Sequence, residues 1–509
     1  MTQPVGSCAI VVHSHLPWLA HHGAWPVGEE WLHQAWATSY LPVVALLERL
    51  AAEGRTDLLT LGVTPVLAAQ LDDPYLLEQF HTWLGFWQAR ALGLVGRPER
   101  HLRDLGAAEH RAAAAALADF ESRWRHGASP LLRRLADAGT VELLGGPATH
   151  PFQPLLTEPV ARFALTAGLD DAKLRVGRRP EGIWAPECGY RPGLEQLYTD
   201  AGVRRFLVDG PTLLGSRHSP ADAWTVGGSD VVAFGRDLEV TYRVWSPRKG
   251  YPGGPWYRDF HTFDHPSGFR PARVTSTRTP PHEKAPYRAD RGHAAALADA
   301  ADFVDVVRRR LLDLAAQRDG RPGLVVVAYD TELFGHWWHE GPVFLEQVLR
   351  ALPEAGVRVT TLRGAVEAGH VAGPAELGPG SWGSGKDWRV WDGEQVADLV
   401  DAQRRLEKRL LDVVSAVARP GSPRRADLDQ LARDALLALS SDWAFMVTKN
   451  SAAGYARDRF EGHLAAFERL ARAVEVGDER VSRQVATEQR AVDGPFGHLD
   501  ARLLRATDE

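Results

Sequence analysis

The sequence contains very little cysteine, with two in 509 residues. Cys8 and Cys188 lie far apart in the chain, which excludes a disulfide framework and a zinc site built from four cysteines. A chain of this length buries enough apolar surface to fold without such cross-links. Because low cysteine usage fits a reducing compartment, we expect a cytoplasmic protein.

Long apolar runs are also missing, and so is a strong excess of either charge. No segment provides the roughly 20 apolar residues that a membrane span needs. The first residues, MTQPVG, lack the basic region of a signal peptide. The net charge of -6 creates no field that would attract nucleic acid or an anionic membrane. No glycine pattern matches a phosphate loop or a dinucleotide fingerprint. We therefore expect a soluble protein with a small or neutral partner, no nucleic acid and no membrane.

Short apolar runs are present, and five of them stop at polar or aromatic residues. They cover residues 8–12, 141–144, 182–186, 205–208 and 325–329. The last run is rich in valine, as expected of a strand buried on both faces of a parallel sheet, and it leads directly into Asp330. Barrel enzymes place their chemistry at the carboxyl ends of their strands. The pattern therefore predicts an α/β barrel with its site at that rim.

Changes in residue composition and spacing along the sequence divide the chain further. Residues 74–138 show helical spacing with no strand signal, which predicts a helical insertion carried on a barrel that spans residues 1–393. Residues 394–509 are predicted to form an α-helical C-terminal domain that contributes to the active-site cleft. The long stretch between residues 208 and 324 contains two segments rich in Gly, Pro, Arg and aromatics, 245–260 and 273–288. We expect a loop region that serves as a lid or binding wall, followed by a helix over about 294–317 that returns the chain to the strand at 325–329.

Two carboxylates and many indoles indicate glycoside chemistry. Glu187 and Asp330 each follow an apolar strand, and two carboxyl groups in different environments are what glycosidic-bond cleavage requires. Asp330 lies among aromatic residues and is expected to be the better desolvated of the two, which favours the acid role. The alternative is that Asp330 caps the following helix. The 17 tryptophans outnumber the 10 tyrosines, and many flank polar clusters, where indole faces can pack on sugar rings.

Three histidines leave several roles open. His13 and His15 follow the run at 8–12, and His150 follows the run at 141–144. Together with Asp330 and His336 they could form a metal-ligand set, as in metal-dependent hydrolases with barrel folds. They could instead be packed core histidines, or they could hydrogen-bond sugar hydroxyls, which is the simplest role.

Taken together, the motifs resemble those of glycoside hydrolase family 57, and within it the branching enzymes. The matching segments are HSHLPW (13–18), GGPATHPFQPLL (145–156), GIWAPECGY (182–190), AYDTELFGHWWHEG (328–341), SWGSGKDWRVW (381–391) and SDWAFM (441–446). They cover nearly the whole chain in order. The resemblance implies an incomplete (β/α)7 barrel with a helical insertion, an α-helical C-terminal domain, and neither metal nor cofactor.

The resemblance also implies roles for individual residues. Glu187 matches the nucleophile and Asp330 the general acid/base. Three histidines match the donor site and three residues match substrate contacts: His13, His15 and His150, then Trp391, Asp442 and Arg258. Trp245, Ser276, Trp337 and Trp443 complete the predicted substrate-binding set. The chain departs from the family at Ser276, where a glycine is expected, at Val400, where an aromatic wall is expected, and at Trp224, the nearest counterpart of a loop tyrosine.

The implied activity is that of a retaining 1,4-α-glucan branching enzyme acting on an α-glucan polysaccharide. Its two carboxyl groups are expected roughly 5 to 5.5 Å apart. Alternatives are an α-amylase or a 4-α-glucanotransferase on the same scaffold, a metal-dependent deacetylase or amidohydrolase, and a glucan-binding protein without catalysis.

Overall fold

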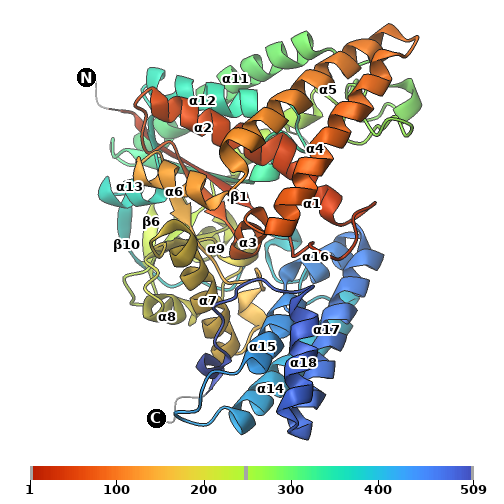
Figure 1. Cartoon of the computed structure of the whole chain (residues 1–509). Coiled ribbons are helices and arrows are strands. Elements are labelled where there is room, and N and C mark those ends of the chain that lie inside the picture. Colours follow the sequence, from red (N-terminus) through yellow and green to blue (C-terminus); the bar gives the residue numbers. More distant parts are fainter. Residues whose placement is uncertain (1–3, 246–249, 506–509) are drawn as a thin grey trace.

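The computed structural model describes residues 4–245 and 250–505. Part of the segment 245–260, residues 246–249, lies outside the described residues. Seven parallel strands form the barrel: β1 (Gly6–Ser14), β2 (Leu59–Val63), β3 (Val141–Leu144), β4 (Gly182–Ile183), β5 (Arg205–Val208), β7 (Val232–Gly235) and β8 (Gly323–Asp330). The expected barrel and helical C-terminal region are both present (Figure 1).

Backbone pairing carries the strands around the barrel in two sheets. One sheet runs β3-β2-β1-β8, and the other contains β7-β5-β4. A bridge between Gly145 and Ile183 joins β3 to β4. On the opposite side the Asp237 amide, just after β7, donates to the Val326 carbonyl of β8 at 2.7 Å. At these two places a single bridge or hydrogen bond replaces full strand pairing, and with seven strands the barrel is incomplete.

The central pair of strands sets the register of the rim. β1 and β8 pair in parallel from Gly6 opposite Gly323 to His13 opposite Asp330. Both strands are buried along almost their whole length, as their continuous apolar sequences predict. His13 and Asp330 therefore emerge side by side at the same edge.

One long helical segment covers this edge of the barrel. Helix α1 (Glu29–Ala35) continues through a π-helical turn (Trp36–Tyr40) into α2 (Leu41–Ala52). The Ser39 hydroxyl donates to the carbonyls of Thr331 and Phe334 at 2.6 and 2.8 Å. The extra residue in the turn thus fastens the segment that follows Asp330, and π-turns are frequent at functional sites.

The expected insertion takes the form of a helical hairpin. Helices α4 (Pro74–Val95) and α5 (Arg100–Asp119) lie side by side and extend away from the barrel (Figure 1, orange). Helix α6 (Ser129–Asp137), which is also in the predicted range, packs against β3 and against α7 (Glu158–Val176) in the outer helical layer of the barrel. The division into domains at residues 74, 138 and 394 remains a prediction.

Between residues 208 and 324 the predicted helix of about 294–317 is confirmed as α11 (Ala289–Ala316), but the prediction of a loop region before it was wrong in its first part. This stretch contains α9 (Gly210–Gly215), β6 (Ala223–Val226), barrel strand β7, α10 (Leu238–Val244) and α11 (Ala289–Ala316). The two strands have only four residues each and are separated by a tight turn with two glycines at positive φ, Gly227 and Gly228. Strand β6 is buried only at its two ends and lacks the continuous apolar run of the predicted strands. Residues 250–288 are largely irregular and form a wall beside the rim.

The C-terminal helices form a separate group beside the barrel (Figure 1, blue). They are α14 (Ala397–Val417), α15 (Ala426–Ala438), α16 (Ser441–Lys449), α17 (Ala453–Val476) and α18 (Glu479–Arg490). The group docks where the Ser441 amide donates to the His150 carbonyl at 3.1 Å and the Thr149 hydroxyl donates to the Leu436 carbonyl at 2.5 Å. Across the described ranges, no helix has the length and apolarity needed to cross a membrane.

Candidate active site

The predicted carboxylates lie at the rim, and Glu187 has the more constrained backbone. It follows β4 in a short turn in which Glu187 and Cys188 both adopt positive φ, 61° and 50°. Its Oε1 accepts the Ser441 hydroxyl and its Oε2 accepts the Trp382 indole N–H, each at 2.8 Å. The Trp382 amide also donates to the Glu187 carbonyl at 2.8 Å. Non-glycine residues in this conformation store strain, which often marks functional sites.

Burial sets the protonation of Glu187. The side chain is buried, and desolvation raises the pKa of its carboxyl to about 7, against the opposing effect of the Trp382 and Ser441 hydrogen bonds. A carboxyl poised near neutrality is a property of catalytic groups.

Asp330 stands at the end of β8 with its carboxylate unengaged. Among the described residues no side chain or amide donates a hydrogen bond to it, and it does not cap the turn that follows. The capping alternative is therefore wrong. Desolvation raises the pKa of Asp330 to about 6. The expectation that Asp330 is the better desolvated carboxyl was also wrong, because Asp330 is half-buried whereas Glu187 is buried.

A third carboxyl group, which the sequence did not single out as a site residue, lies behind Asp330. Glu332 is buried and accepts hydrogen bonds from the Tyr40 hydroxyl and from the His15 amide. Desolvation and the charge of Asp330 raise the pKa of Glu332 to about 8. Glu332 is therefore largely neutral near pH 7, and of these two carboxyl groups Asp330 ionises first.

The three histidines form a stacked layer beside the carboxylates. His13 stacks on Trp184 with ring centres 4.2 Å apart, and His15 stacks on His150 at 3.9 Å. Burial lowers the pKa of His13 and His150 well below its usual value, so both are neutral. Burial also lowers the pKa of His15, but the adjacent Asp442 carboxylate outweighs this effect and raises it overall. Asp442 Oδ2 accepts from His15 Nε2 at 2.9 Å.

The hydrogen bonds determine the tautomer of His150. Ser441 donates its proton to Glu187, so its oxygen must accept from His150 Nδ1, 3.0 Å away. The proton of neutral His150 is therefore on Nδ1, and Nε2 carries a lone pair. That Nε2 atom is buried and has no partner among the described residues, so it can accept a hydrogen bond from a bound hydroxyl.

The metal-ligand set that the sequence allowed is not assembled as expected. His336 lies apart from the three histidines, against Phe260 at 5.4 Å. In the part of the chain that is described, His15, His150 and Asp442 do bring donor atoms within 4.8 Å of one another. Two of these donors are already engaged, since His15 Nε2 bonds to Asp442 and His150 Nδ1 to Ser441.

The remaining predicted residues lie at varying distances from this centre. Trp245 and Trp337 stack on each other with ring centres 5.8 Å apart, and both are at least partly exposed. Arg258 pairs with Glu109 of the insertion at 2.6 Å. Ser276 is exposed in the irregular wall.

Two of the predicted indoles are fully buried. Trp391 stacks on Phe152 at 4.6 Å. Trp443 donates to the Leu437 carbonyl inside the helical group. The structure thus brings together Glu187, Asp330, Asp442 and the three histidines, and it does not bring Arg258, Ser276 or Trp443 to them.

Sequence reasoning missed the residues that hold Glu187. Trp382 and Ser441 lie within the motifs SWGSGKDWRVW and SDWAFM, so the segments were recognised, but Trp391, Asp442 and Trp443 were named from them and these two residues were not. In the second motif the carboxylate of Asp442 and the indole of Trp443 were chosen for their chemistry, and the serine beside them, which bonds to Glu187, was passed over. The turn of helix that places Ser441 toward Glu187 turns Trp443 into the helical group.

Comparisons with known protein families agree with this geometry. A model described as glycosyl hydrolase family 57 matches residues 9–372, which include nearly all of the barrel and both carboxylates. A second model, described as the C-terminal part of 1,4-alpha-glucan branching enzyme, matches residues 403–504.

Individual proteins give the same result. The chain is 54% identical over 520 residues to a Mycobacterium tuberculosis protein named probable 1,4-alpha-glucan branching enzyme, covering 98% of each. A crystal structure of a branching enzyme of this family from Pyrococcus horikoshii superposes with a TM-score of 0.92 at 30% identity, covering 99% of this chain and 97% of that one. An alpha-amylase from Thermotoga maritima superposes with a TM-score of 0.87 at 25% identity, covering 99% of both.

Proposed function

The chain belongs to glycosyl hydrolase family 57, and we propose that it is a retaining 1,4-α-glucan branching enzyme in which Glu187 is the nucleophile and Asp330 the general acid/base. The proposal rests on the different hydrogen bonding of two carboxylates that lie at the same rim of the barrel. Glu187 is held by donors on both oxygens, whereas Asp330 has none among the described residues. A nucleophile must be fixed, and an acid must be free to meet the glycosidic oxygen.

In the first step Glu187 attacks the anomeric carbon of an internal α-1,4 linkage. The bond to the leaving oxygen breaks, and Asp330 gives its proton to that oxygen, so one glucan chain departs and a glucosyl ester forms on Glu187. The indole N–H of Trp382 stays on the second carboxylate oxygen throughout. It stabilises the ionised form before attack and the ester carbonyl afterwards.

In the second step the 6-hydroxyl of another glucan chain attacks the same carbon. Asp330, now ionised, takes the hydroxyl proton, the ester bond to Glu187 breaks, and an α-1,6 linkage forms with retained configuration. Water competes for the ester. Branching therefore depends on keeping water away and on holding an acceptor chain in place.

The sugar bound at the ester is proposed to lie against the histidine layer. His150 Nε2 accepts from a sugar hydroxyl, and His13 and His15, with Asp442 behind His15, complete the polar wall. Trp245 and Trp337 are proposed as stacking surfaces for neighbouring sugars. Contacts of Trp391, Trp443, Arg258 and Ser276 with substrate remain predictions, as do the roles inferred above. The substrate is proposed to be a cytoplasmic α-glucan such as amylose or glycogen.

The decisive experiment measures the products formed from amylose. A branching enzyme creates α-1,6 linkages, detected by a debranching enzyme or by proton NMR, with few new reducing ends. An α-amylase creates reducing ends alone, and a 4-α-glucanotransferase redistributes chain lengths and forms neither. The amylase outcome is a real alternative because a Thermotoga maritima alpha-amylase has nearly the same fold, and either of the last two results would contradict the proposal.

The activity is expected to follow a bell-shaped pH profile with its maximum between about 6 and 7. The productive form has Glu187 ionised and Asp330 protonated, whereas the pKa values are about 7 and about 6. Because the nucleophile has the higher pKa, the acid limb bends near 6 and the basic limb near 7. Measuring kcat/KM from pH 4 to 9 checks this. A profile with one limb would contradict the assignment of two titrating groups.

Replacing Ser441 by alanine is expected to raise the pKa of Glu187, because it removes a donor that favours the carboxylate. A rise of about one unit lowers kcat/KM roughly tenfold below pH 7 and moves the basic limb upward by the same amount. The deficit should vanish above pH 8, where Glu187 is ionised in both proteins.

The control is Ser441→Thr, which keeps the hydroxyl and should restore the profile. A loss of activity that is uniform at all pH values would show that Ser441 merely supports the fold. A profile identical to that of the wild type would show that the hydrogen bond to Glu187 does not matter.

A further inference from the structure

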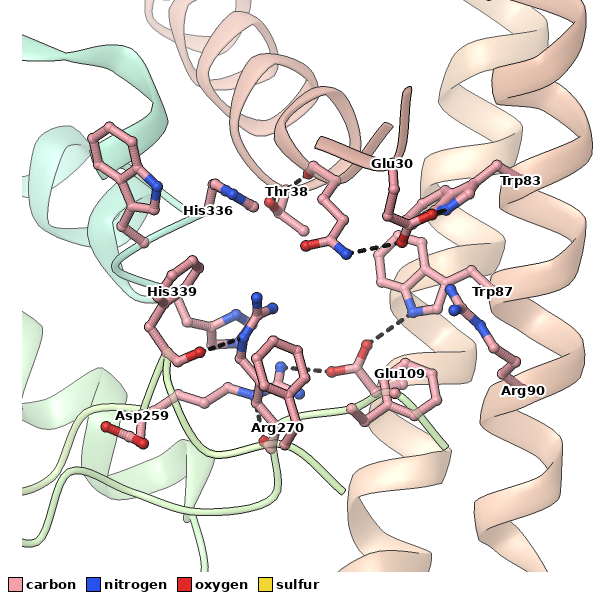
Figure 2. Close-up of a pocket in the computed structure, with 18 of the residues that line it drawn as sticks. Glu30, Thr38, Trp83, Trp87, Arg90, Glu109, Asp259, Arg270, His336 and His339 are labelled. Atoms are coloured by element: carbon pink, nitrogen blue, oxygen red, sulfur yellow. Dashed lines mark hydrogen bonds and ion pairs between the residues drawn. The ribbon is translucent and has the colours of Figure 1, made fainter. Parts of the chain in front are cut away.

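A second cleft opens beside the catalytic centre, between the insertion and the irregular wall. It encloses about 770 Å³, including space open to solvent. Figure 2 shows Glu30 and Thr38 along one edge, Trp83 and Trp87 from α4 on one side, and Arg270 and His336 facing them. None of the residues that line it is Glu187, Asp330 or one of the three stacked histidines.

The walls of the cleft carry aromatic rings from three parts of the chain. Trp83 comes from the insertion, Trp337 from the segment after β8, and Phe260 and Phe263 from the irregular wall. All four are half-buried or exposed, so part of each ring is available. Opposed aromatic faces with polar groups between them suit sugar rings, whose faces are apolar and whose edges carry hydroxyls.

The polar groups of the cleft fit hydroxyls. The Arg270 guanidinium lies between Phe260 and Phe263, 4.4 Å from each ring centre, and donates through Nε to the Phe260 carbonyl. Within the described ranges it makes no ion pair, so its terminal N–H groups remain as donors. Glu30 accepts from the Trp83 indole at 2.8 Å and from Gln34, leaving lone pairs for further donors. Burial and the charge of Arg270 lower the pKa of His336 to about 3, which keeps this imidazole neutral.

The cleft is held open by an ion pair between its two sides. Arg258 Nη1 lies 2.6 Å from Glu109 Oε1, and Glu109 Oε2 accepts from the Trp87 indole at 2.9 Å. Glu109 is itself buried. The irregular wall is thus fastened to the insertion helices, so that the aromatic faces keep their separation without a ligand.

The cleft lies on the Asp330 side of the centre. Its lining includes Thr38 and Gly335. Ser39, next to Thr38, donates to the carbonyls of Thr331 and Phe334 in the segment that follows Asp330. Glu187, in contrast, is held from the other side by Trp382 and Ser441. An acid/base group faces the oxygen that leaves or attacks, so a chain carrying that oxygen must approach from the Asp330 side.

We propose that this cleft between α4, α5 and the irregular wall binds the acceptor glucan chain, with Trp83 and Arg270 as its principal contacts. The inference rests on the branching activity proposed above. It gives the helical insertion a function: one wall of the site that decides whether the glucosyl ester is passed to a 6-hydroxyl or to water.

The test compares Trp83→Ala and Arg270→Met with two matched controls. Methionine keeps an apolar stem between the two phenylalanine rings and removes the donors. The controls are Phe86→Ala, an exposed aromatic on the same helix outside the cleft, and Arg273→Gln, a guanidinium that stacks on Trp256 outside it. For each protein the ratio of new α-1,6 linkages to new reducing ends from amylose is measured, together with Tm. The binding of maltoheptaose is measured in the Glu187→Gln background, in which no reaction occurs.

The cleft variants are expected to lower the ratio of branching to hydrolysis by about fivefold or more, as for loss of a principal contact, and to weaken maltoheptaose binding. The controls are expected to match the parent protein.

An unchanged ratio in folded cleft variants overturns the proposal, as does an equal loss of both products, which would place the donor chain in the cleft. If Arg270→Met lowers Tm severely, Trp83→Ala on the opposite wall carries the test. A wild-type protein that forms no α-1,6 linkages refutes the proposed activity, and the binding measurement then still reports on the cleft.

Discussion

Replacing Glu187 by glutamine is expected to lower kcat/KM for amylose by at least about 10⁴-fold. The amide cannot form the glucosyl ester, so both steps of the reaction lose their intermediate. Glutamine has the shape of the carboxyl group, and its oxygen can still accept from Trp382 while its N–H group donates to the Ser441 oxygen. The loss should therefore lie in chemistry and not in folding. The measurement is the initial rate of α-1,6 linkage formation, with reducing ends counted in parallel.

The melting temperature of Glu187→Gln serves as a control for correct folding of the variant. Glu187 is buried and the pKa of its carboxyl is raised to about 7, so the folded protein favours the protonated form. The stability associated with that form is present below the unfolded pKa and is lost as the pH rises through 7. Glu187→Gln should therefore melt at a higher temperature than the wild type at pH 8 and at nearly the same temperature at pH 4, which lies below the unfolded pKa. An inactive variant that melts earlier at both pH values would point to misfolding, and a variant that keeps more than a hundredth of the activity would remove Glu187 from the nucleophile role.

Replacing Asp330 by asparagine is expected to lower kcat/KM for amylose by about 10³-fold, within the range that loss of a general acid/base produces. Asp330 delivers a proton to a glucan oxygen, which is a poor leaving group without it. A maltoside with an aryl leaving group of low pKa needs no such proton, so the deficit in forming the ester should shrink for it. With that substrate the pH profile should lose its basic limb and show only a rise near pH 7, where Glu187 ionises.

Glu332→Gln is the matched control for Asp330→Asn. Glu332 lies two residues away and is more deeply buried than Asp330, and the pKa of its carboxyl is raised to about 8, so it is already neutral at the optimum. Glutamine imitates that neutral form, and less than a tenfold change in kcat/KM is expected. An equal loss in the two variants, or an equal deficit of Asp330→Asn on glucan and aryl substrates, would contradict the acid/base assignment.

Much of the barrel could be predicted because its signals are local. The runs that end at His13, Glu187 and Asp330 are buried strands that stop where the chain turns polar, and the sequence displays both features directly. Strands β6 and β7 have four residues each, as the predicted strands β3 and β5 do, but they flank the glycine turn at 227–228 in a stretch rich in Gly and polar residues, and β6 is buried only at its two ends. Their place in the fold is set by pairing with β5 and β10 (Val371–Ala375), which no local pattern encodes.

The functional roles could be predicted only in part, for a different physical reason. That Asp330 is less buried than Glu187 depends on what covers each side chain. Glu187 is covered by Ser441 and Trp382, which lie 254 and 195 residues away in the sequence. The aromatic residues near Asp330 in the sequence suggested that it is the more desolvated carboxyl. In the structure Tyr329 and Phe334 contact each other, and Trp337 stacks on Trp245. The direction of the Trp443 indole, which bonds to the Leu437 carbonyl, could not be predicted either, since the side of a helix that faces the site depends on how the helix docks.

The strained turn at Glu187 and Cys188 limits which amino acids can stand beside the nucleophile. Two successive residues hold positive φ there, and the side chain at position 188 is fully enclosed. β-Branched residues resist that backbone, and anything much larger than cysteine would have to displace the neighbouring walls, whereas glycine would relax the turn and let the carboxylate drift. The room for sequence variation at this position is therefore narrow for mechanical reasons alone, with no chemistry required of the thiol.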